Sequence, residues 1–201
     1  GRAGGDVSAR PVSTRVACLE IQRFALPGTA SKLISRIGSF SARAACATGA
    51  VAIGEAARRL WSGEADVNVM LAGGSDSVMT ALGIAAFGRL GALSTKNDTP
   101  ERACAPFSAD RDGTVVGEGA AVIVLETLAH AQRRGAPILA ELAGYGLTSD
   151  AVHLVMPDPQ GTYAARAMAA ALRQAGLRSG DLGWICAHGT GTQLNDVSET
   201  R

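Results

Sequence analysis

Short apolar runs that fit buried strands alternate along this chain with longer segments of helical spacing. In residues 49–65 the apolar side chains recur at helical intervals and Gly63 follows the last of them. This pattern predicts a helix that begins at or just after Cys46 and ends at the glycine. The run 66–76 follows as a buried strand that leads into a Gly-Gly turn. Such an alternation predicts a layered α/β fold, because each face of a sheet needs helices to cover it.

The same two patterns continue through the rest of the chain. Residues 161–177 form the clearest helix, since alanine and leucine favour helices, and a strand at 184–188 follows and ends at His188. The other expected elements are helices at 81–93 and 128–136 and strands at 121–127 and 138–147. No linker or internal repeat interrupts them, so residues 1–201 are interpreted as one domain or a slice of one.

Charge and hydropathy exclude several classes of protein. The chain has 201 residues, 47% hydrophobic and 18% charged, and a formal net charge of +1, so no overall field attracts nucleic acid or an anionic membrane. No uncharged run approaches the roughly 18 to 20 residues of a membrane span. Residues 1–15 lack the apolar core of a signal peptide. We therefore expect a cytoplasmic protein, and the start at Gly1 and the end at Arg201 suggest a fragment.

One of the four cysteines has a setting that suits chemistry. Cys46 lies in "AACATGA" at the expected start of a helix, where unpaired N–H groups and the helix dipole favour a thiolate. Its small neighbours leave room for a substrate and for backbone N–H groups to form an oxyanion hole. Taken alone, the stretch fits better a small residue that fills a gap in the core. The other cysteines are interpreted as packing or incidental residues, without C-x-x-C pairs that would indicate zinc: Cys18, Cys104 and Cys186.

A second candidate lies in "AHGTGTQLND", where a strand is expected to end at His188 and enter a glycine-rich polar loop. The carboxyl ends of strands are where α/β folds tend to place ligands. A histidine that caps a turn is the structural alternative. The "GTGT" run lacks the full pattern of a nucleotide-binding loop, so that function is excluded. His130 and His153 have no ligand-like neighbours and are interpreted as bystanders.

Four segments in a fixed order carry a resemblance that neither motif carries alone. They are "ACATGA", "DVNVMLAGGSD", "LSTKNDTPERACAPFSADRDGTVVGEGAAVIVLE" and "AHGTGTQLNDVSET". In this order they resemble the condensing β-ketoacyl-[acyl-carrier-protein] synthases, or ketosynthases, of fatty-acid and polyketide assembly. The resemblance covers residues 44–201 of a predicted partial ketosynthase domain, 1–201. Residues 1–43 match less well, since the approach to the cysteine lacks the family's Gly-Pro-Ser-like step.

The resemblance implies a role for each motif. Cys46 would accept an acyl group from the phosphopantetheine thioester of an acyl carrier protein, and a malonyl-type extender would lose carbon dioxide and attack the resulting thioester. His188 would donate a hydrogen bond to the extender's thioester oxygen as charge develops there. Thr190 and Thr192 would bind the pantetheine arm, unless they are ordinary loop threonines that bond their own backbone. The protein itself would bind no cofactor and no metal.

Acidic residues near these motifs are expected to be structural. Asp196 and Glu199 match the acidic pair that supports the family's active-site network indirectly. Asp110, Asp112 and Glu118 are interpreted as turn and ion-pair residues.

The resemblance also implies a thiolase-like fold, an αβαβα layering of two similar halves. This chain would hold the end of the first half, with the Cys46 helix inside, and the start of the second. The family's second histidine and its lysine would lie beyond Arg201. A homodimer or a ketosynthase heterodimer is expected. Three alternatives stay open: a non-catalytic partner subunit, against which the retained Cys46 argues, an inactive truncated fragment, and a coenzyme A thiolase, against which the HGTGT loop argues.

Overall fold

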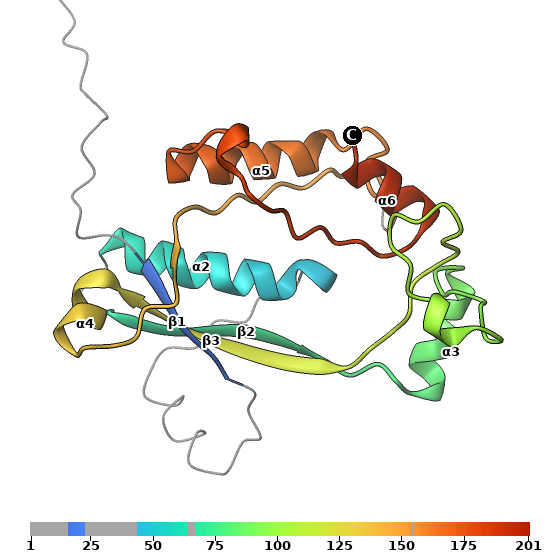
Figure 1. The fold of residues 1–201 in the computed structure, drawn as a ribbon, viewed down its shortest axis with the longest axis horizontal. Coiled ribbons are helices and arrows are strands. Elements are labelled where there is room, and N and C mark those ends of the chain that lie inside the picture. Colours follow the sequence, from blue (N-terminus) through green and yellow to red (C-terminus); the bar gives the residue numbers. More distant parts are fainter. Residues whose placement is uncertain (1–15, 23–43, 64–66, 154) are drawn as a thin grey trace, which may run out of the picture. The chain divides into compact units, whose positions relative to one another are not determined.

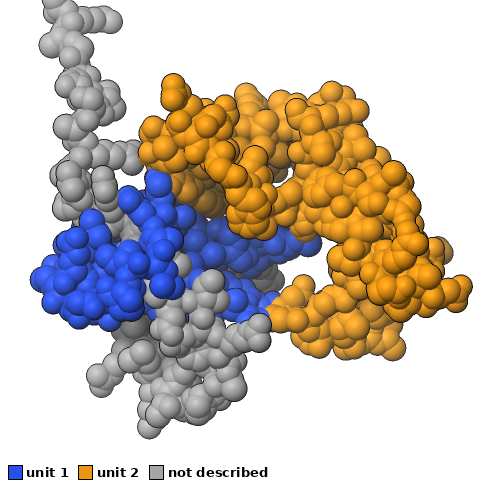
Figure 2. Space-filling model, viewed as in Figure 1, with its two compact units in different colours: residues 1–75, 120–143 blue, residues 76–119, 144–201 orange. Residues whose placement is uncertain are grey.

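The computed structural model describes residues 16–22, 44–63, 67–153 and 155–201. The chain divides into two compact units, which Figure 2 colours separately. The first comprises residues 1–75 and 120–143, and the second comprises 76–119 and 144–201. Each unit is described by itself.

A four-stranded sheet in the order β2-β3-β1-β4 forms the base of the first unit (Figure 1). Strand β1 pairs antiparallel with both β3 and β4, and its register with β3 shifts at an irregularity between Cys18 and Ile21. The strand bounds are β1 Val16–Gln22, β2 Val69–Asp76, β3 Gly119–Thr127 and β4 Ala140–Leu142. The predicted strand at 121–127 is confirmed, whereas the strand predicted at 138–147 is only three residues long.

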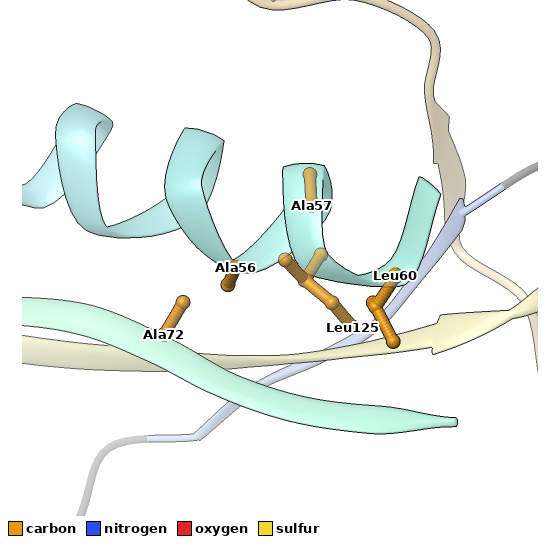
Figure 3. Close-up of a cluster of buried hydrophobic side chains, with 5 residues drawn as sticks. All are labelled: Ala56, Ala57, Leu60, Ala72 and Leu125. Atoms are coloured by element: carbon orange, nitrogen blue, oxygen red, sulfur yellow. The ribbon is translucent and has the colours of Figure 1, made fainter. Parts of the chain in front are cut away.

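Helix α2 (Thr48–Ser62) covers this sheet and makes the core of the unit. One face of the helix buries Ala56, Ala57 and Leu60, which pack against Ala72 of β2 and Leu125 of β3 (Figure 3). The helix ends at Gly63, whose φ of 66° lies in the left-handed region that glycine adopts without strain. The helix and its end are therefore as predicted from the spacing of the apolar residues.

Replacing Leu60 with alanine should lower the free energy of unfolding by about 2–5 kcal/mol, because it removes buried methyl groups and leaves a cavity. Leu60 is 1% exposed, whereas Leu82 in the second unit is 81% exposed. Leu82→Ala is therefore the matched control, with an expected change within about 0.5 kcal/mol. Urea denaturation of both variants measures the difference, and equal losses would contradict this account of the core.

Strand β2 approaches its neighbours closely through two glycines. A Cβ on Gly73 would lie 2.8 Å from the Cα of Val122 on β3, and a Cβ on Gly74 would lie 3.3 Å from the Cα of Gly49 in α2. The prediction that these glycines form a turn is wrong, because β2 continues through both. The glycines instead let another strand and the first turn of α2 come near. Only Ala72 of β2 is buried, so the strand is less buried than predicted.

A buried carboxylate lies one residue before the end of β3 in the first unit. Glu126 is 2% exposed and accepts hydrogen bonds of 2.9 and 3.1 Å from Nε of Arg134. Arg134 caps α4 (Leu128–Arg133), the short helix with a basic end that was predicted at 128–136. Arg134 thus links the C-terminal end of α4 to Glu126 of the preceding strand β3.

Among the described residues of the second unit there are three α-helices, of which α5 (Thr162–Ala175) is the longest and confirms the clearest sequence prediction. The others are α3 (Ala81–Arg89) and α6 (Gln193–Glu199). Two short 3-10 helices also belong to this unit: η3 (Pro100–Arg102) follows α3, and η4 (Ser179–Asp181) lies between α5 and α6. The segment that leaves β4 runs against α5: a Cβ on Gly146 would lie 2.9 Å from the carbonyl carbon of Ala167. Packing against a helix replaces strand pairing there, which is why the predicted strand is short.

The strand predicted at 184–188 is absent among the described residues. A strand requires a hydrogen-bonded neighbour, and this segment has none in the described part of the chain. The apolar side chains of Trp184 and Ile185 are not buried here, since they are 81% and 60% exposed. None of the helices among the described residues combines the length and the apolar character that a membrane span requires.

Candidate active site

Cys46 lies in the single 3-10 turn η2 (Ala45–Ala47), directly before α2. The Thr48 hydroxyl ties this turn together, since it accepts the N–H of Ala44 at 2.9 Å and donates to the carbonyl of Ala45 at 2.7 Å. Ala45 has a φ of 47°, a left-handed conformation that is strained for a residue with a side chain. The predicted position at the start of a helix is confirmed.

The Cys46 thiol is exposed in this structure. The prediction of a buried helix start is wrong for the described residues, because the whole turn Ala45–Ala47 is exposed. The first buried residue of α2 is Val51. An exposed thiol next to strained backbone is a recurring feature of nucleophilic sites, where the surrounding structure holds a turn that the chain would otherwise avoid.

Glu199 fixes the backbone of the loop that carries His188. One carboxylate oxygen of Glu199 accepts the N–H of His188 at 2.6 Å, and the other accepts the N–H of Gly189 at 2.7 Å. The side chain of Asn195 donates to the same carboxylate at 2.8 Å. Both Asn195 and Glu199 lie on α6, so this short helix fixes the position of the His188 backbone.

Asp196, also on α6, joins the same loop to a second one. It is 2% exposed, and its two oxygens accept the N–H of Gly191 at 3.1 Å and the N–H of Phe107 at 2.7 Å. The guanidinium of Arg111 lies 3.3 Å from the carboxylate and balances its charge. Arg111 also donates to the carbonyl of Thr192 at 3.3 Å. Asp196 and Glu199 therefore act on the loop backbone, which agrees with the structural role expected for them.

The glycines of "GTGT" are required by the loop itself. Gly189 and Gly191 have φ values of 55° and 74°, both in the left-handed region. A Cβ on Gly191 would also lie 2.7 Å from the carbonyl oxygen of Gly113. This close approach, rather than a nucleotide phosphate, explains the glycine pattern.

Thr190 and Thr192 place their hydroxyls together, 2.8 Å apart, and both residues are half-buried. One O–H serves the bond between them, so the other O–H is free to reach a further acceptor. The N–H of Thr192 also approaches the Thr190 hydroxyl at 3.4 Å. These contacts partly support both interpretations of the two residues, since the threonines bond within the loop and still offer a donor.

The acidic residues around the other glycine-rich loop have structural partners. Asp110 forms ion pairs with Lys96 at 3.4 Å and with Arg102 at 3.5 Å, and Glu118 accepts the N–H of Met79 at 3.0 Å. Hydrogen bonds from the Ser108 side chain and from Lys96 lower the pKa of Asp110. These contacts match the turn and ion-pair roles predicted from the sequence.

Asp112 holds the start of the loop that follows Leu93. It accepts the hydroxyl of Ser94 at 2.6 Å and the N–H of Thr95 at 2.9 Å. These two hydrogen bonds lower the pKa of Asp112 from 3.8 to about 2. Because hydrogen bonds to the charged form favour that form, the folded protein keeps this carboxylate ionised further into acid than the unfolded chain does.

Asp112→Asn should therefore remove part of the acid sensitivity of the fold. A pKa depressed in the folded state contributes stability above about pH 4, and this contribution is lost as the pH falls toward about 2. The difference in unfolding free energy between the wild type and the variant should be constant above that window and shrink within it. Urea denaturation at a series of pH values measures it. A difference that does not change with pH would contradict the assignment.

The structure distributes the predicted site residues over both units. Cys46 belongs to the first unit, whereas His188, Thr190 and Thr192 belong to the second and share one loop. Among the residues expected to be bystanders, His153 stabilises its own loop, because its Nδ1 accepts the N–H groups of Val155 and Met156, each at 3.1 Å.

The remaining cysteines were expected to be packing or incidental residues. Cys104 and Cys186 are exposed and so are not packing residues. The side chain of Cys18 lies outside the described part of the chain.

Two residues of this site were not predicted from the sequence. Phe107 and Arg111 contact the His188 loop through Asp196, which lies 89 and 85 positions further along the chain. Both residues lie in the third segment that carries the resemblance, and Arg111 lies in its glycine-rich run "DRDGTVVGEGA". That run indicates a turn without indicating a partner.

Known proteins match the chain over most of its length. Residues 27–131 match the family described as Beta-ketoacyl synthase, N-terminal domain, and residues 139–201 match Beta-ketoacyl synthase, C-terminal domain. A mitochondrial 3-oxoacyl-[acyl-carrier-protein] synthase of Arabidopsis thaliana is 51% identical over 158 residues, which cover 78% of this chain and 34% of that protein. The chain thus spans about a third of the length of the curated relatives it matches, 34% and 37% for two of them.

Solved structures that resemble this chain include ketosynthases as well. One is titled as a type II PKS acyl-carrier protein in complex with its ketosynthase; it has a TM-score of 0.76, is 36% identical, and is matched over 85% of this chain and 43% of its own. Another, a ketosynthase in complex with its chain length factor from Xenorhabdus doucetiae, has a TM-score of 0.66 at 34% identity, over 77% of this chain and 35% of its own. The predicted thiolase-like α/β fold is confirmed, and the chain covers part of it. The chain therefore belongs to the β-ketoacyl synthase family.

Proposed function

We propose that Cys46 and His188 belong to the active site of an acyltransferase. This enzyme would perform decarboxylative Claisen condensation in fatty-acid or polyketide synthesis. The observation that carries the proposal is the exposed Cys46 thiol in a strained turn directly before α2. The His188 loop, held by two carboxylates of α6, supplies the second group that the reaction requires.

In the first half-reaction, the sulfur of Cys46 attacks the carbonyl carbon of an acyl thioester on a carrier protein. A new carbon–sulfur bond forms to Cys46, the bond to the pantetheine sulfur breaks, and the carrier thiol leaves with the proton. The covalent intermediate divides one difficult step into two easier ones. The small residues around Cys46 leave room for the acyl chain to approach.

In the second half-reaction, a malonyl thioester loses carbon dioxide, and the electron pair of the broken bond enters the thioester as an enolate. His188 donates a hydrogen bond to the enolate oxygen, a role for which its backbone is already fixed by Glu199. The enolate carbon then attacks the Cys46 thioester. A carbon–carbon bond forms, and the Cys46 sulfur leaves as a thiolate.

The substrates arrive on the phosphopantetheine arm of an acyl carrier protein, which is the proposed partner. The arm is rich in amides, and the free hydroxyl of the Thr190–Thr192 pair suits an amide oxygen.

No resident cofactor or metal is required, because the cysteine and the histidine perform the chemistry. We further propose a homodimer or a ketosynthase heterodimer, the latter supported by the complex with a chain length factor among the similar structures, and a cytoplasmic location.

Incubating the natural protein that carries this chain with an acyl-carrier and a malonyl-carrier thioester tests the proposal. A β-ketoacyl-carrier product with release of carbon dioxide is expected. The same acyl groups on coenzyme A, without malonyl thioester, test the thiolase alternative, which predicts condensation in that mixture. If neither mixture yields product, and the protein acts only when added to a second ketosynthase, it is a non-catalytic partner subunit.

A further inference from the structure

Phe107 combines strained backbone with an exposed side chain. It has a φ of 62°, in the left-handed region that is strained for any residue with a side chain. Its side chain is nevertheless 45% exposed, so the conformation is not explained by packing of the ring into a core. Backbone held in such a conformation persists only when the surroundings impose it, and it occurs preferentially at functional sites.

Two charged residues impose this conformation. Asp196 accepts the Phe107 N–H at 2.7 Å, and this carboxylate is 2% exposed. Arg111 fixes Asp196 from the same loop as Phe107, 3.3 Å from the carboxylate, and donates at 2.9 Å to the carbonyl of Ser108. The turn at Phe107 is therefore held from both sides by charged groups that are themselves well covered.

The ring of Phe107 stands against the loop of His188. A Cβ built on Gly189 would lie 3.3 Å from Cε2 of Phe107 and 3.5 Å from Cβ of Pro106. The N–H of Gly189 is held at the same time by Glu199. Gly189 thus has a carboxylate on its N–H and an aromatic ring against its Cα, and it is the residue that follows His188.

We propose that Phe107 is a positioning residue, whose ring fixes the backbone at Gly189 and through it the imidazole of His188. The proposal rests on the proposed function, since it assigns the effect to the half-reaction in which His188 acts. Acylation of Cys46 does not use the imidazole of His188 in the proposed mechanism. Loss of the ring should therefore affect the two half-reactions unequally.

The kinetic test compares Phe107→Ala, Phe107→Gly and Phe107→Tyr in the natural protein. Alanine and glycine both remove the ring, and glycine also adopts the left-handed backbone without strain, so it keeps the bond to Asp196 if alanine prevents folding. For both, kcat of malonyl-thioester decarboxylation should fall about 10- to 100-fold, the cost of a slightly misplaced group. KM and Cys46 acylation should stay within about twofold. Phe107→Tyr keeps the ring and should keep the wild-type kcat. Leu82→Ala should leave kcat, KM and acylation at their wild-type values.

A second measurement does not depend on activity. Because the ring edge lies where a Cβ of Gly189 would project, one α-proton of Gly189 faces the ring, and the ring current shifts its NMR resonance. That shift should vanish in Phe107→Gly and remain in Phe107→Tyr. An unchanged resonance, unchanged decarboxylation, or equal losses in both half-reactions would overturn the proposal. A wild type that neither acylates nor decarboxylates would instead refute the proposed function, and the resonance would still decide whether Phe107 fixes the loop.

Discussion

Cys46→Ala is expected to abolish acylation of the protein by an acyl-carrier thioester. Alanine has no nucleophile, and the acyl-enzyme intermediate on which condensation depends cannot form. The turn before α2 should survive, because the Thr48 hydroxyl ties it through backbone groups of neighbouring residues. Incubation with a radiolabelled acyl-carrier thioester, followed by denaturing electrophoresis, measures the label bound to the protein.

Two matched controls suit this variant. Cys104 and Cys186 are free and exposed like Cys46, so general reactivity of accessible thiols would label all three. Cys104→Ala and Cys186→Ala should retain the wild-type level of label. Persistence of label in Cys46→Ala would contradict the assignment of the nucleophile.

His188→Ala is expected to leave acylation in place and to lower malonyl decarboxylation by about 10²- to 10³-fold, the effect of removing one donor to a developing oxyanion. The loop should keep its conformation, because Glu199 binds the backbone N–H groups of residues 188 and 189 rather than the imidazole. Release of labelled carbon dioxide from malonyl thioester measures the rate.

His153→Ala is the control for loss of an imidazole in the same unit. Its Nδ1 serves only local backbone N–H groups among the contacts described, so decarboxylation should remain near the wild-type rate. A His188→Ala variant with undiminished decarboxylation, in protein that is folded by circular dichroism, would remove His188 from the mechanism.

The elements that could be predicted are those whose signal is local. The spacing of apolar residues in α2 and the glycine after it specify a helix and its end, and they place Cys46 at its start. The alanine and leucine content of residues 161–177 likewise predicted α5, the longest described helix of the second unit. Motif order identified the family, because four segments in sequence are far more specific than any one of them.

The features that were missed depend on partners distant in the sequence. An apolar run at 184–188 is compatible with a strand, but only a neighbouring strand can make it one. Gly73 and Gly74 signal either a turn or a close approach, and the choice depends on what lies opposite, here Val122 and Gly49. The bond from Phe107 to Asp196 spans 89 positions, and nothing local to either residue reveals it.

Location of the acyl group in a single turnover tests the central claim most directly. The natural protein is loaded with an acyl group from a carrier thioester and digested, and mass spectrometry assigns the modified peptide. The acyl mass should be on the peptide that contains Cys46, and it should leave that peptide on addition of malonyl thioester and appear in a β-ketoacyl product. An acyl group on any other residue, or one that stays on Cys46 after malonyl thioester is added, would contradict the account.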